Sequence, residues 1–517
     1  MGVLADLYKP SLALLTDLYE LTMACGYWKA GIHRREAVFH LLFRENPFRG
    51  GFTVACGLQT AVEYLERFRF DKADLAFMAT VRGADGEPIF ERAFLDFLGE
   101  MRFICDVDAV PEGTVVFPHE PLVRVAGPLI ESQIVETALL NIINFQTLIA
   151  TKAARVVMAA RGDPVLEFGL RRAQGIDGGL SASRAAYVGG CAGTSNVLAG
   201  RLYGIPVKGT HAHSWVMCFD DEPQAFEAYA EAMPNNCVFL VDTYDTLQGV
   251  KNAVEVGRAL RRKGHEMLGI RLDSGDLAYL SIEARKILDE AGFPNAAVVA
   301  SNDLDEHLIA SLKGQGAAIG VWGVGTRLVT GYDQPALGGV YKLSAIRSPD
   351  GTWQDKVKVS DETAKTSTPG ILQVRRYRQK KGTGPICAEH RAPAEGWSGR
   401  PGKLDLSPFF LGDVIFDLEH PIRGDCEMVD PADATHRTTV PHGTDFADLL
   451  VPVFRQGERV CDLPSIDDAR RRVEEQLAEF HPRVKRFVNP HLYPVGLEMG
   501  LYERKTEIIL KERGLQP

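Results

Sequence analysis

Seven short apolar runs, each stopped by glycine or polar residues, constrain the fold of this 517-residue chain more than any other feature. Stretches with helical apolar spacing, such as residues 246–262 and 277–291, separate several of these runs. Strands that alternate with helices predict parallel pairing with right-handed crossovers. The stops begin at Gly169, Gly193, Gly209, Asp242, Arg271, Ser301 and Gly323.

Polar side chains after every predicted strand favour a (β/α) barrel, because the rim of a barrel is built from the loops at those strand ends. An open doubly wound sheet, the alternative, gathers its functional residues at one switch point. We therefore expect an α/β barrel with the active site in residues 131–345. Residues 1–130 mix helical and strand-like runs, and residues 346–517 hold loops, short strand-like runs and one charged helix. These three segments are the predicted domains.

Composition narrows the setting in which the chain works. A net charge of -10 gives no general attraction to nucleic acid or to an anionic membrane. Nine scattered cysteines, without a Cys-x-x-Cys pair, indicate reduced thiols rather than a disulfide framework. No apolar run is expected to reach the length of ~20 residues that spans a bilayer. The first residues do not resemble a secretory signal. We expect a cytoplasmic protein.

Two histidines separated by one residue, His211 and His213, follow the third apolar run directly. Histidine changes its charge near neutral pH, so this position suits catalysis. Hydrogen bonding that caps the loop is the alternative. A metal-dependent barrel hydrolase is another, but it needs further histidine or cysteine ligands on other strand ends. Those ends carry none, and His265 and His307 fall in or beside helical stretches.

Two glycine-bearing stops could hold an anion. In Gly323-Val324-Gly325-Thr326 the glycines allow backbone N–H groups to approach a phosphate, and the threonine can donate its hydroxyl. Gly193-Thr194-Ser195 is a second candidate. For each loop, a tight turn of the barrel without a bound anion is the alternative explanation. Neither contains a Walker loop or a dinucleotide-binding fingerprint.

Charged and aromatic residues complete the inventory of the predicted rim. Arg271 can pair with a carboxylate, and Asp273 with Asp276 could hold Mg²⁺ or ribose hydroxyls, although a salt-bridged loop is the alternative. Phe168 beside Arg171 could stack on a flat ring or fill core. Together these groups suit a phosphorylated, partly aromatic pair of small molecules.

Several of these segments, in order along most of the chain, resemble nicotinate phosphoribosyltransferase. The resemblance also includes residues 16–19 near the start and 489–495 near the end, and it is weakest between about 385 and 460. The segments are Glu167-Phe168-Gly169-Leu170-Arg171-Arg172-Ala173-Gln174-Gly175, Ser195-Asn196-Val197-Leu198-Ala199, Gly209-Thr210-His211-Ala212-His213-Ser214, Arg271-Leu272-Asp273-Ser274-Gly275-Asp276 and Gly323-Val324-Gly325-Thr326.

The resemblance implies an irregular α/β barrel of the type II phosphoribosyltransferase kind, with an α+β domain built from the N- and C-terminal parts. It implies a homodimer whose active sites are shared between subunits. The implied reaction joins nicotinate to phosphoribosyl pyrophosphate, with Mg²⁺, and releases nicotinate mononucleotide and pyrophosphate for NAD salvage. ATP, as a co-substrate, is hydrolysed to ADP and phosphate, which places the enzyme among the ligases.

The resemblance also assigns roles to individual residues. His213 is expected to be phosphorylated transiently by ATP, with Asp273 as a second catalytic residue near the substrate. Nicotinate is expected between Phe168 and Tyr19, the latter from the partner subunit. Arg171, Thr210 and Arg271 are implied as further substrate contacts. The ribose phosphate is expected near Ser301, Asn302, Gly323, Gly325 and Thr326.

Ser195 bears on the choice of substrate. Nicotinamide-specific relatives resemble one another in having an aspartate there, which would accept from an amide N–H₂ and repel the nicotinate carboxylate. Serine therefore favours the acid. The nicotinamide and quinolinate enzymes are the alternatives among enzymes, and a ligand-sensing protein on a degenerate barrel is the non-enzymatic one.

Overall fold

The computed structural model describes residues 7–8, 11–360, 365–378 and 410–515. The chain forms two compact units. The first comprises 1–144, 338–464 and 474–517, and the second 145–337 and 465–473. The second unit contains the predicted barrel. Two helices, α7 (Glu136–Ala160) and α16 (Ile466–Glu479), run across the unit boundaries in sequence.

A six-stranded parallel sheet, ordered β7-β6-β11-β10-β9-β8, forms the centre of the second unit. Five of the strands overlap a predicted apolar run, whereas β7 is formed by the first two residues of the predicted stop that begins at Gly193. Because all pairs are parallel, the stops at the carboxyl ends lie along one edge. The strands are β6 (Val165–Glu167), β7 (Gly193–Thr194), β8 (Val238–Leu240), β9 (Gly269–Leu272), β10 (Ala297–Ala300) and β11 (Val321–Val324).

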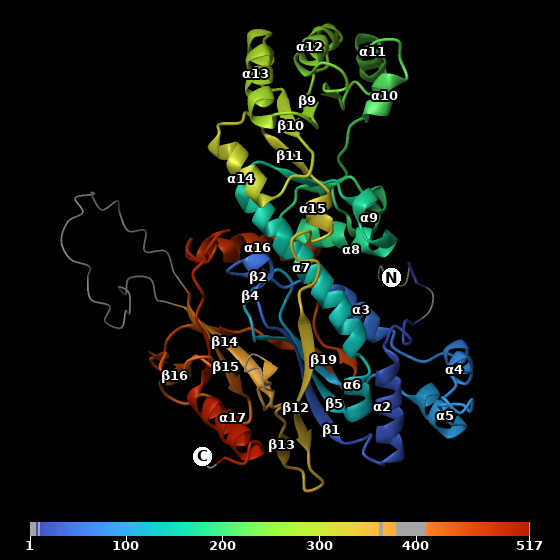
Figure 1. Cartoon of the computed structure of the whole chain (residues 1–517), viewed down its shortest axis with the longest axis vertical. Helices are drawn as coiled ribbons and strands as arrows, with labels where there is room; N and C mark the ends of the chain where they lie inside the picture. Colours follow the sequence, from blue (N-terminus) through green and yellow to red (C-terminus); the bar gives the residue numbers. More distant parts are fainter. Residues whose placement is uncertain (1–6, 9–10, 361–364, 379–409, 516–517) are drawn as a thin grey trace, which may run out of the picture. The chain divides into compact units, whose positions relative to one another are not determined.

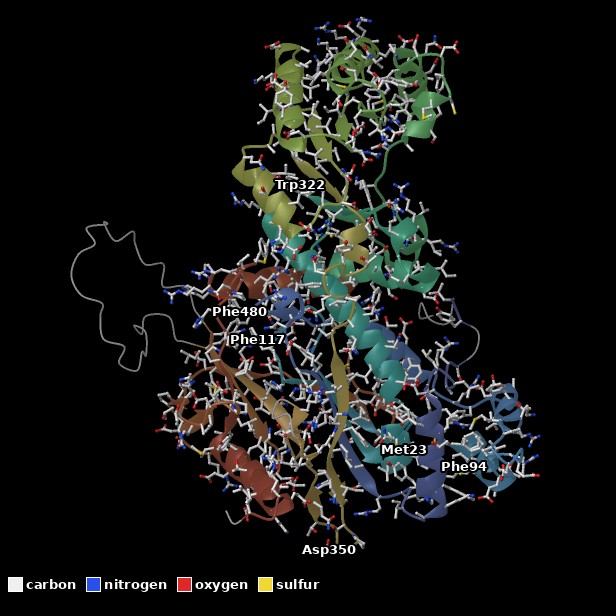
Figure 2. The ribbon with its side chains drawn as sticks, viewed as in Figure 1. Met23, Phe94, Phe117, Trp322, Asp350 and Phe480 are labelled. Carbon is white, nitrogen blue, oxygen red and sulfur yellow. The ribbon has the colours of Figure 1, made fainter. Side chains whose placement is uncertain are left out.

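Helices connect these strands, and side-chain oxygens start many of them. Asp245, Asp276 and Asp305 each accept a hydrogen bond from a backbone N–H in the first turn of the helix that follows. In Figure 1, α12 and α13 lie beside β9 and β10. Figure 2 marks Trp322, fully buried on β11. The helices are α8 (Gly175–Val188), α9 (Val197–Tyr203), α10 (His213–Met217), α11 (Glu222–Ala232), α12 (Thr246–Arg262), α13 (Leu277–Glu290), α14 (Glu306–Gly314) and α15 (Thr326–Val329).

The seventh predicted strand is reduced to a single parallel bridge between Val207 and Thr194. Side chains connect this edge to the opposite edge strand, β8. His211 Nε2 accepts from Leu240 N at 3.3 Å, and Asn236 Nδ2 donates to the Gly209 carbonyl at 3.3 Å. The predicted barrel is confirmed, and this side-chain connection is one source of its irregularity.

In the first unit, one antiparallel sheet draws its strands from both ends of the chain. Its order is β13-β12-β1-β5-β3-β19-β20, so β1 lies between a strand that precedes the barrel in sequence and one that follows it. The predicted α+β domain made of N- and C-terminal parts is therefore confirmed. The strands are β1 (Glu36–Phe43), β3 (Asp106–Ala109), β5 (Pro121–Pro128), β12 (Gly339–Arg347), β13 (Trp353–Asp355), β19 (Val451–Arg455) and β20 (Glu458–Arg459).

A second sheet of this unit has the order β17-β16-β21-β15-β14-β18. A buried ion pair joins Arg376 and Asp413 across β14 and β15, and Phe117 and Phe480, marked in Figure 2, pack together beside that arginine. The strands are β14 (Leu372–Arg378), β15 (Phe410–Asp417), β16 (Cys426–Val429), β17 (Arg437–Val440), β18 (Phe446–Asp448) and β21 (Val495–Glu498), with a separate pair, β2 (Thr53–Val54) and β4 (Val115–Val116).

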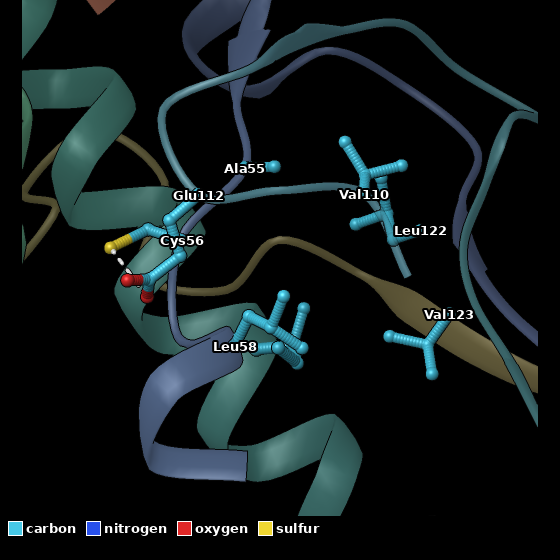
Figure 3. A pocket seen from close by; sticks show the side chains of 8 residues that line it. Ala55, Cys56, Leu58, Val110, Glu112, Leu122 and Val123 are labelled. Atoms are coloured by element: carbon cyan, nitrogen blue, oxygen red, sulfur yellow. Dashed lines mark hydrogen bonds between the residues drawn. The ribbon is translucent and has the colours of Figure 1, made fainter. Parts of the chain in front are cut away.

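Helices complete the first unit, and a small cavity lies between them and the strands. The cavity, of about 10 Å³, is shown in Figure 3 beside Cys56 and Glu112, whose carboxylate accepts from Gly57 N at 2.6 Å. Its volume suits at most one water molecule. The helices are α2 (Leu18–Lys29), α3 (Leu58–Glu66), α4 (Lys72–Met78), α5 (Arg92–Glu100), α6 (Leu129–Gln133) and α17 (Met499–Glu512).

One helical stretch corrects an expectation from the sequence. Leu129–Ala160 is long and apolar enough, by length and composition, to cross a membrane. The sequence reading missed this length because isolated polar residues interrupt the run. In the structure 61% of its most apolar window is buried inside the protein, and Lys152 and Arg155 on it pair with Glu306. These contacts are those of a core helix.

Candidate active site

His213 begins α10, and its imidazole lies among groups from two neighbouring strand ends. Its Nδ1 is 3.1 Å from Thr243 Oγ1. Its Nε2 lies 3.9 Å from Asp242 Oδ1 and 3.8 Å from Asp273 Oδ2. The side chain remains 39% exposed, so a substrate can reach it. The structure thus brings the two predicted catalytic residues, His213 and Asp273, together.

Asp242 is the main functional residue that the sequence reading missed. Its carboxylate is fully buried, and Oδ2 accepts from Asp273 N and Ser274 Oγ, both at 2.7 Å. Its Oδ1, on the side of His213, is buried without a hydrogen-bond partner among the described residues. Asp242 therefore fixes the turn that carries Asp273. The only signal in the sequence was its position as a strand stop.

Arg271 and Thr210, both predicted substrate contacts, are bonded to each other. Arg271 Nη1 donates to Thr210 Oγ1 at 3.0 Å, while its Nε is buried and has no hydrogen-bond partner in the part of the chain that the structure describes. Burial lowers the pKa of Arg271, and the nearby Asp273 and Asp242 carboxylates oppose that shift. A guanidinium with a spare donor beside a hydroxyl suits a carboxylate ligand.

His211 has a different environment from His213. Its ring is 92% buried, lies against Phe226 and Tyr229, and accepts from the Leu240 backbone N–H. Burial lowers its pKa to about 4, and the charges of Arg271 and His213 add to that shift. It is therefore neutral near pH 7 and holds the loop to β8.

The backbone around Phe168 is held by a buried carboxylate. Glu167, at the end of β6, accepts from Gly169 N, from Ser183 Oγ at 2.8 Å and from Thr194 Oγ1 at 2.6 Å. The Phe168 ring lies against Gly323, where a Cβ would be only 2.8 Å from it. The half-buried ring is therefore set firmly at the rim, and Glu167 is a second residue whose role the sequence reading missed.

The predicted phosphate-binding residues lie on the loops after β10 and β11, which are paired strands. Ser301 donates to the Asp273 carboxylate. Asn302 and Asp303 have positive φ values of 95° and 25°, an uncommon conformation outside glycine that occurs often at functional sites. In the next loop, Gly325 caps α15, which starts at Thr326. The structure thus brings the two predicted phosphate loops side by side.

The remaining predicted contacts are distributed less compactly. Ser195 follows β7, and its N–H donates to the Glu167 carbonyl at 2.9 Å, which places it beside Phe168. Arg171 is exposed, and its positive charge lies near enough to Arg271 to lower the pKa of Arg271. Tyr19 belongs to the other unit, where its hydroxyl bonds to Glu136 at 3.4 Å and burial raises its pKa. The role of Tyr19 in a partner's site stays a prediction.

A buried ion network supports the loop after β10. Lys152 on α7 is 2.7 Å from both Glu306 and Asp333, and Arg155 is 2.7 Å from Glu306. Although burial opposes it, the charges of Lys152 and Arg155 lower the pKa of Glu306. Glu306 is the first residue of α14, so the network anchors the helix that follows the loop predicted to bind phosphate. The sequence reading did not anticipate this network.

The metal-hydrolase alternative lacks its ligands in the part of the chain that the structure describes. No group of three or more His, Cys, Asp and Glu side chains there is placed to hold a metal ion.

Comparison with known proteins identifies the family. Models of nicotinate phosphoribosyltransferase match in three parts: the N-terminal domain over residues 14–144, the family core over 165–378 and the C-terminal domain over 407–505. The nicotinate phosphoribosyltransferase of Bacillus subtilis (strain 168) is 43% identical over 96% of this chain and 95% of its own, and that of Caenorhabditis elegans is 35% identical over 95% and 92%. The crystal structure of human nicotinic acid phosphoribosyltransferase matches with a TM-score of 0.79 and 32% identity, over 95% of this chain and 99% of that one. The chain belongs to the nicotinate phosphoribosyltransferase family.

Proposed function

We propose that this chain joins nicotinate to phosphoribosyl pyrophosphate, with ATP hydrolysis, to make nicotinate mononucleotide for NAD synthesis. One observation carries the proposal. His213 lies between the Thr243 hydroxyl and the Asp242 and Asp273 carboxylates, on the rim that also presents Arg271. The names of the relatives support the phosphoribosyl transfer to nicotinate, and the proposed ATP step rests on His213.

Nicotinate is flat and carries a carboxylate, and two features of the rim match it. The Phe168 ring offers an aromatic face held in place by the close approach of Gly323. The spare Nε donor of Arg271 can bond the carboxylate. Ser195 adds a hydroxyl and no negative charge, which favours nicotinate over nicotinamide.

The transfer step requires positioning and charge stabilisation. The C1–O bond of the sugar breaks, pyrophosphate leaves with the electron pair, and the pyridine nitrogen lone pair forms the new C1–N bond. Positive charge develops at C1, where a carboxylate such as that of Asp273 stabilises it. Asp242 and Asp273 would hold Mg²⁺ together with substrate oxygens, and the ion would neutralise the leaving pyrophosphate. The unpartnered Oδ1 of Asp242 fits that task.

ATP coupling is assigned to His213. Two carboxylates on the Nε2 side favour a proton on that nitrogen, which leaves the lone pair on Nδ1. Nδ1 attacks the γ-phosphorus of ATP, the bond to the ADP oxygen breaks, and ADP leaves with the electrons. Hydrolysis of the phosphohistidine then returns phosphate and the free imidazole.

The test is product analysis with nicotinate, phosphoribosyl pyrophosphate and Mg²⁺, with and without ATP. We expect nicotinate mononucleotide in both cases and more of it with ATP. His213→Ala should keep basal transfer but lose ATP stimulation and the acid-labile phosphate, while His265→Ala, away from the rim, should keep all three. An unchanged ATP response in His213→Ala would reject the phosphohistidine.

Parallel assays with nicotinamide and quinolinate separate the related enzymes. Better use of nicotinamide than nicotinate would overturn the argument from Ser195. Absence of pyrophosphate release with every pyridine would support the ligand-sensing alternative.

We further propose a cytoplasmic homodimer with shared active sites. All cysteines among the described residues are free thiols, as a reducing compartment requires. If Tyr19 of one subunit contributes to the active site of the other, the Tyr19→Ala and His213→Ala variants should each lose ATP-stimulated activity when assayed alone. Their mixture should regain ATP-stimulated activity in heterodimers, and no regain in a mixed dimer would reject the shared site.

A further inference from the structure

A second, larger pocket lies in the unit that is built from both ends of the chain. Its volume is about 390 Å³, which is within the range of small-molecule sites. It lies beside the β12–β13 hairpin, whose tip carries Asp350 in Figure 2. The space exists partly because Ala345, Gly351 and Gly370 line it without large side chains. None of the residues proposed for transfer or phosphorylation lines it.

The hairpin gives the pocket an aromatic wall next to a carboxylate. Trp353 and Asp355 are two residues apart on β13, so their side chains project from the same face. Arg347 pairs with Trp353 across the strands and lies 5.2 Å from its ring, while Ala345 pairs with Asp355. Because alanine is small, space remains above the Asp355 carboxylate.

The floor of the pocket is a hydrogen-bonded network around the buried Asp417 carboxylate. Asp417 accepts from Ile371 N at 3.1 Å and from Arg504 Nη2 at 2.7 Å. Arg504 Nη1 contacts His420 Nδ1 at 2.5 Å. Arg347 is paired with Glu36 and donates to the Gly351 carbonyl. Both guanidinium groups therefore have protein partners, although Arg504 Nε makes no hydrogen bond to any described residue.

Asp355 and Arg504 Nε lie close to each other without a direct hydrogen bond, and among the described residues Arg504 Nε has no other hydrogen-bond partner. Arg504 Nε is the cationic atom nearest to the Asp355 carboxylate in the part of the chain that the structure describes, at 3.9 Å, which is beyond hydrogen-bond distance. The Asp355 side chain is only 25% exposed. Burial raises the pKa of Asp355, although Arg504 opposes the shift. The exposed Glu419 adds a third carboxylate to the lining, besides Asp355 and the hydrogen-bonded Asp417.

We propose that this pocket binds a small, flat organic cation, such as an aromatic amidinium, whose ring lies against Trp353 and whose charge pairs with Asp355. An aromatic face beside a carboxylate is an arrangement that recognises organic cations. An anion is disfavoured because it would meet the Asp355 and Glu419 carboxylates, and because the buried Arg504 Nε lies beside Asp355 rather than apart from it. The inference does not depend on the proposed function of the barrel.

The test uses ¹⁹F NMR of the full-length protein labelled with 5-fluorotryptophan. Trp353→Phe assigns the pocket resonance by its disappearance, and Trp215→Phe assigns a reporter on α10, beside His213. Benzamidinium is the probe, benzamide is its neutral isostere, and inorganic phosphate represents anions. Asp355→Asn removes the charge at constant shape. Glu503→Gln, an exposed carboxylate on the same helix as Arg504, is the matched control.

We expect benzamidinium to shift the Trp353 resonance in a saturable way. Asp355→Asn should weaken binding by about tenfold or more, because a charge-assisted hydrogen bond is lost, and Glu503→Gln should leave it unchanged. If Asp355→Asn lowers the thermal midpoint, Glu419→Gln replaces it, with a smaller weakening expected. No shift at Trp353, a shift at Trp215 alone, equal binding of benzamide, or a response to phosphate instead would each overturn the proposal.

Discussion

Gly323 holds the Phe168 ring where a pyridine can stack on it, and Gly323→Ala tests that relation directly. A Cβ at position 323 would lie 2.8 and 2.9 Å from two carbons of the ring, closer than real Cβ contacts come. The backbone of Phe168 is fixed by its hydrogen bond to the Val324 carbonyl and by Glu167 next to it, so the ring itself must move.

Loss of a well-placed aromatic partner costs about 0.5–1.5 kcal/mol, so the KM for nicotinate should rise about two- to tenfold. Steady-state kinetics with varied nicotinate at saturating phosphoribosyl pyrophosphate measure it. Gly320→Ala is the matched control, because nothing lies within 4 Å of a Cβ there. It should leave KM unchanged.

A double-mutant cycle separates displacement of the ring from general damage. In a Phe168→Leu background, Gly323→Ala should raise KM by much less than it does alone, because the displaced ring is already missing. Full additivity of the two changes, or an equal effect of Gly320→Ala, would refute the reasoning.

Three further outcomes follow from the described contacts. Asp242→Asn should lower the rate of His213 phosphorylation by about tenfold to a hundredfold, because it removes the negative charge 3.9 Å from His213 Nε2, measured with γ-³²P-ATP. Glu306→Gln should leave Lys152 buried without its full counter-charge and destabilise the barrel by about 3–5 kcal/mol, measured by urea unfolding with hydrogen exchange. His211 has a pKa lowered to about 4, so stability present above about pH 6.5 should be lost as pH falls toward 4, and His211→Gln should flatten that part of the pH profile.

Each of these predictions has a control. Ser274→Ala removes one of the two hydrogen-bond donors to Asp242 Oδ2 and should lower the rate of phosphorylation less than Asp242→Asn does. Glu283→Gln breaks only an exposed pair with Lys286 and should change stability by less than about 1 kcal/mol. An equal loss in Glu283→Gln and Glu306→Gln would contradict the importance of burial. An unchanged acid limb in His211→Gln would contradict the role of that histidine.

The sequence predicted the barrel well because each strand ends in residues of a distinct type. Asp273 and Ser301 followed apolar runs in the sequence, and parallel pairing brings them into contact. The position of Asp242 was visible, but its contact with His213 depends on how two loops fold toward each other, which periodicity does not encode. The buried ion pair of Lys152 could not be predicted, because a charged residue in an apolar helix does not reveal its distant partner, Glu306.

The interleaved sheet was predictable only through the family resemblance. The pairing of β1 with β12 joins residues about 300 positions apart, and no local pattern specifies such a partner. The weak seventh strand shows the opposite limit. Val207 lies in an apolar run, but it makes only a single β-bridge, to Thr194. The connection to β8 is made instead by the His211 side chain, which accepts from Leu240 N.

The interleaving also sets an order of events during translation. β1 pairs with β5 on one side, but its other partner, β12, begins about 210 residues after β5 ends. At typical elongation rates that interval is roughly 10–40 s. For that time a nascent chain presents an open strand edge, the kind that pairs with other chains. The six strands of the barrel sheet all lie within the interval, so that sheet can form on the ribosome before the sheet that surrounds it in sequence is complete.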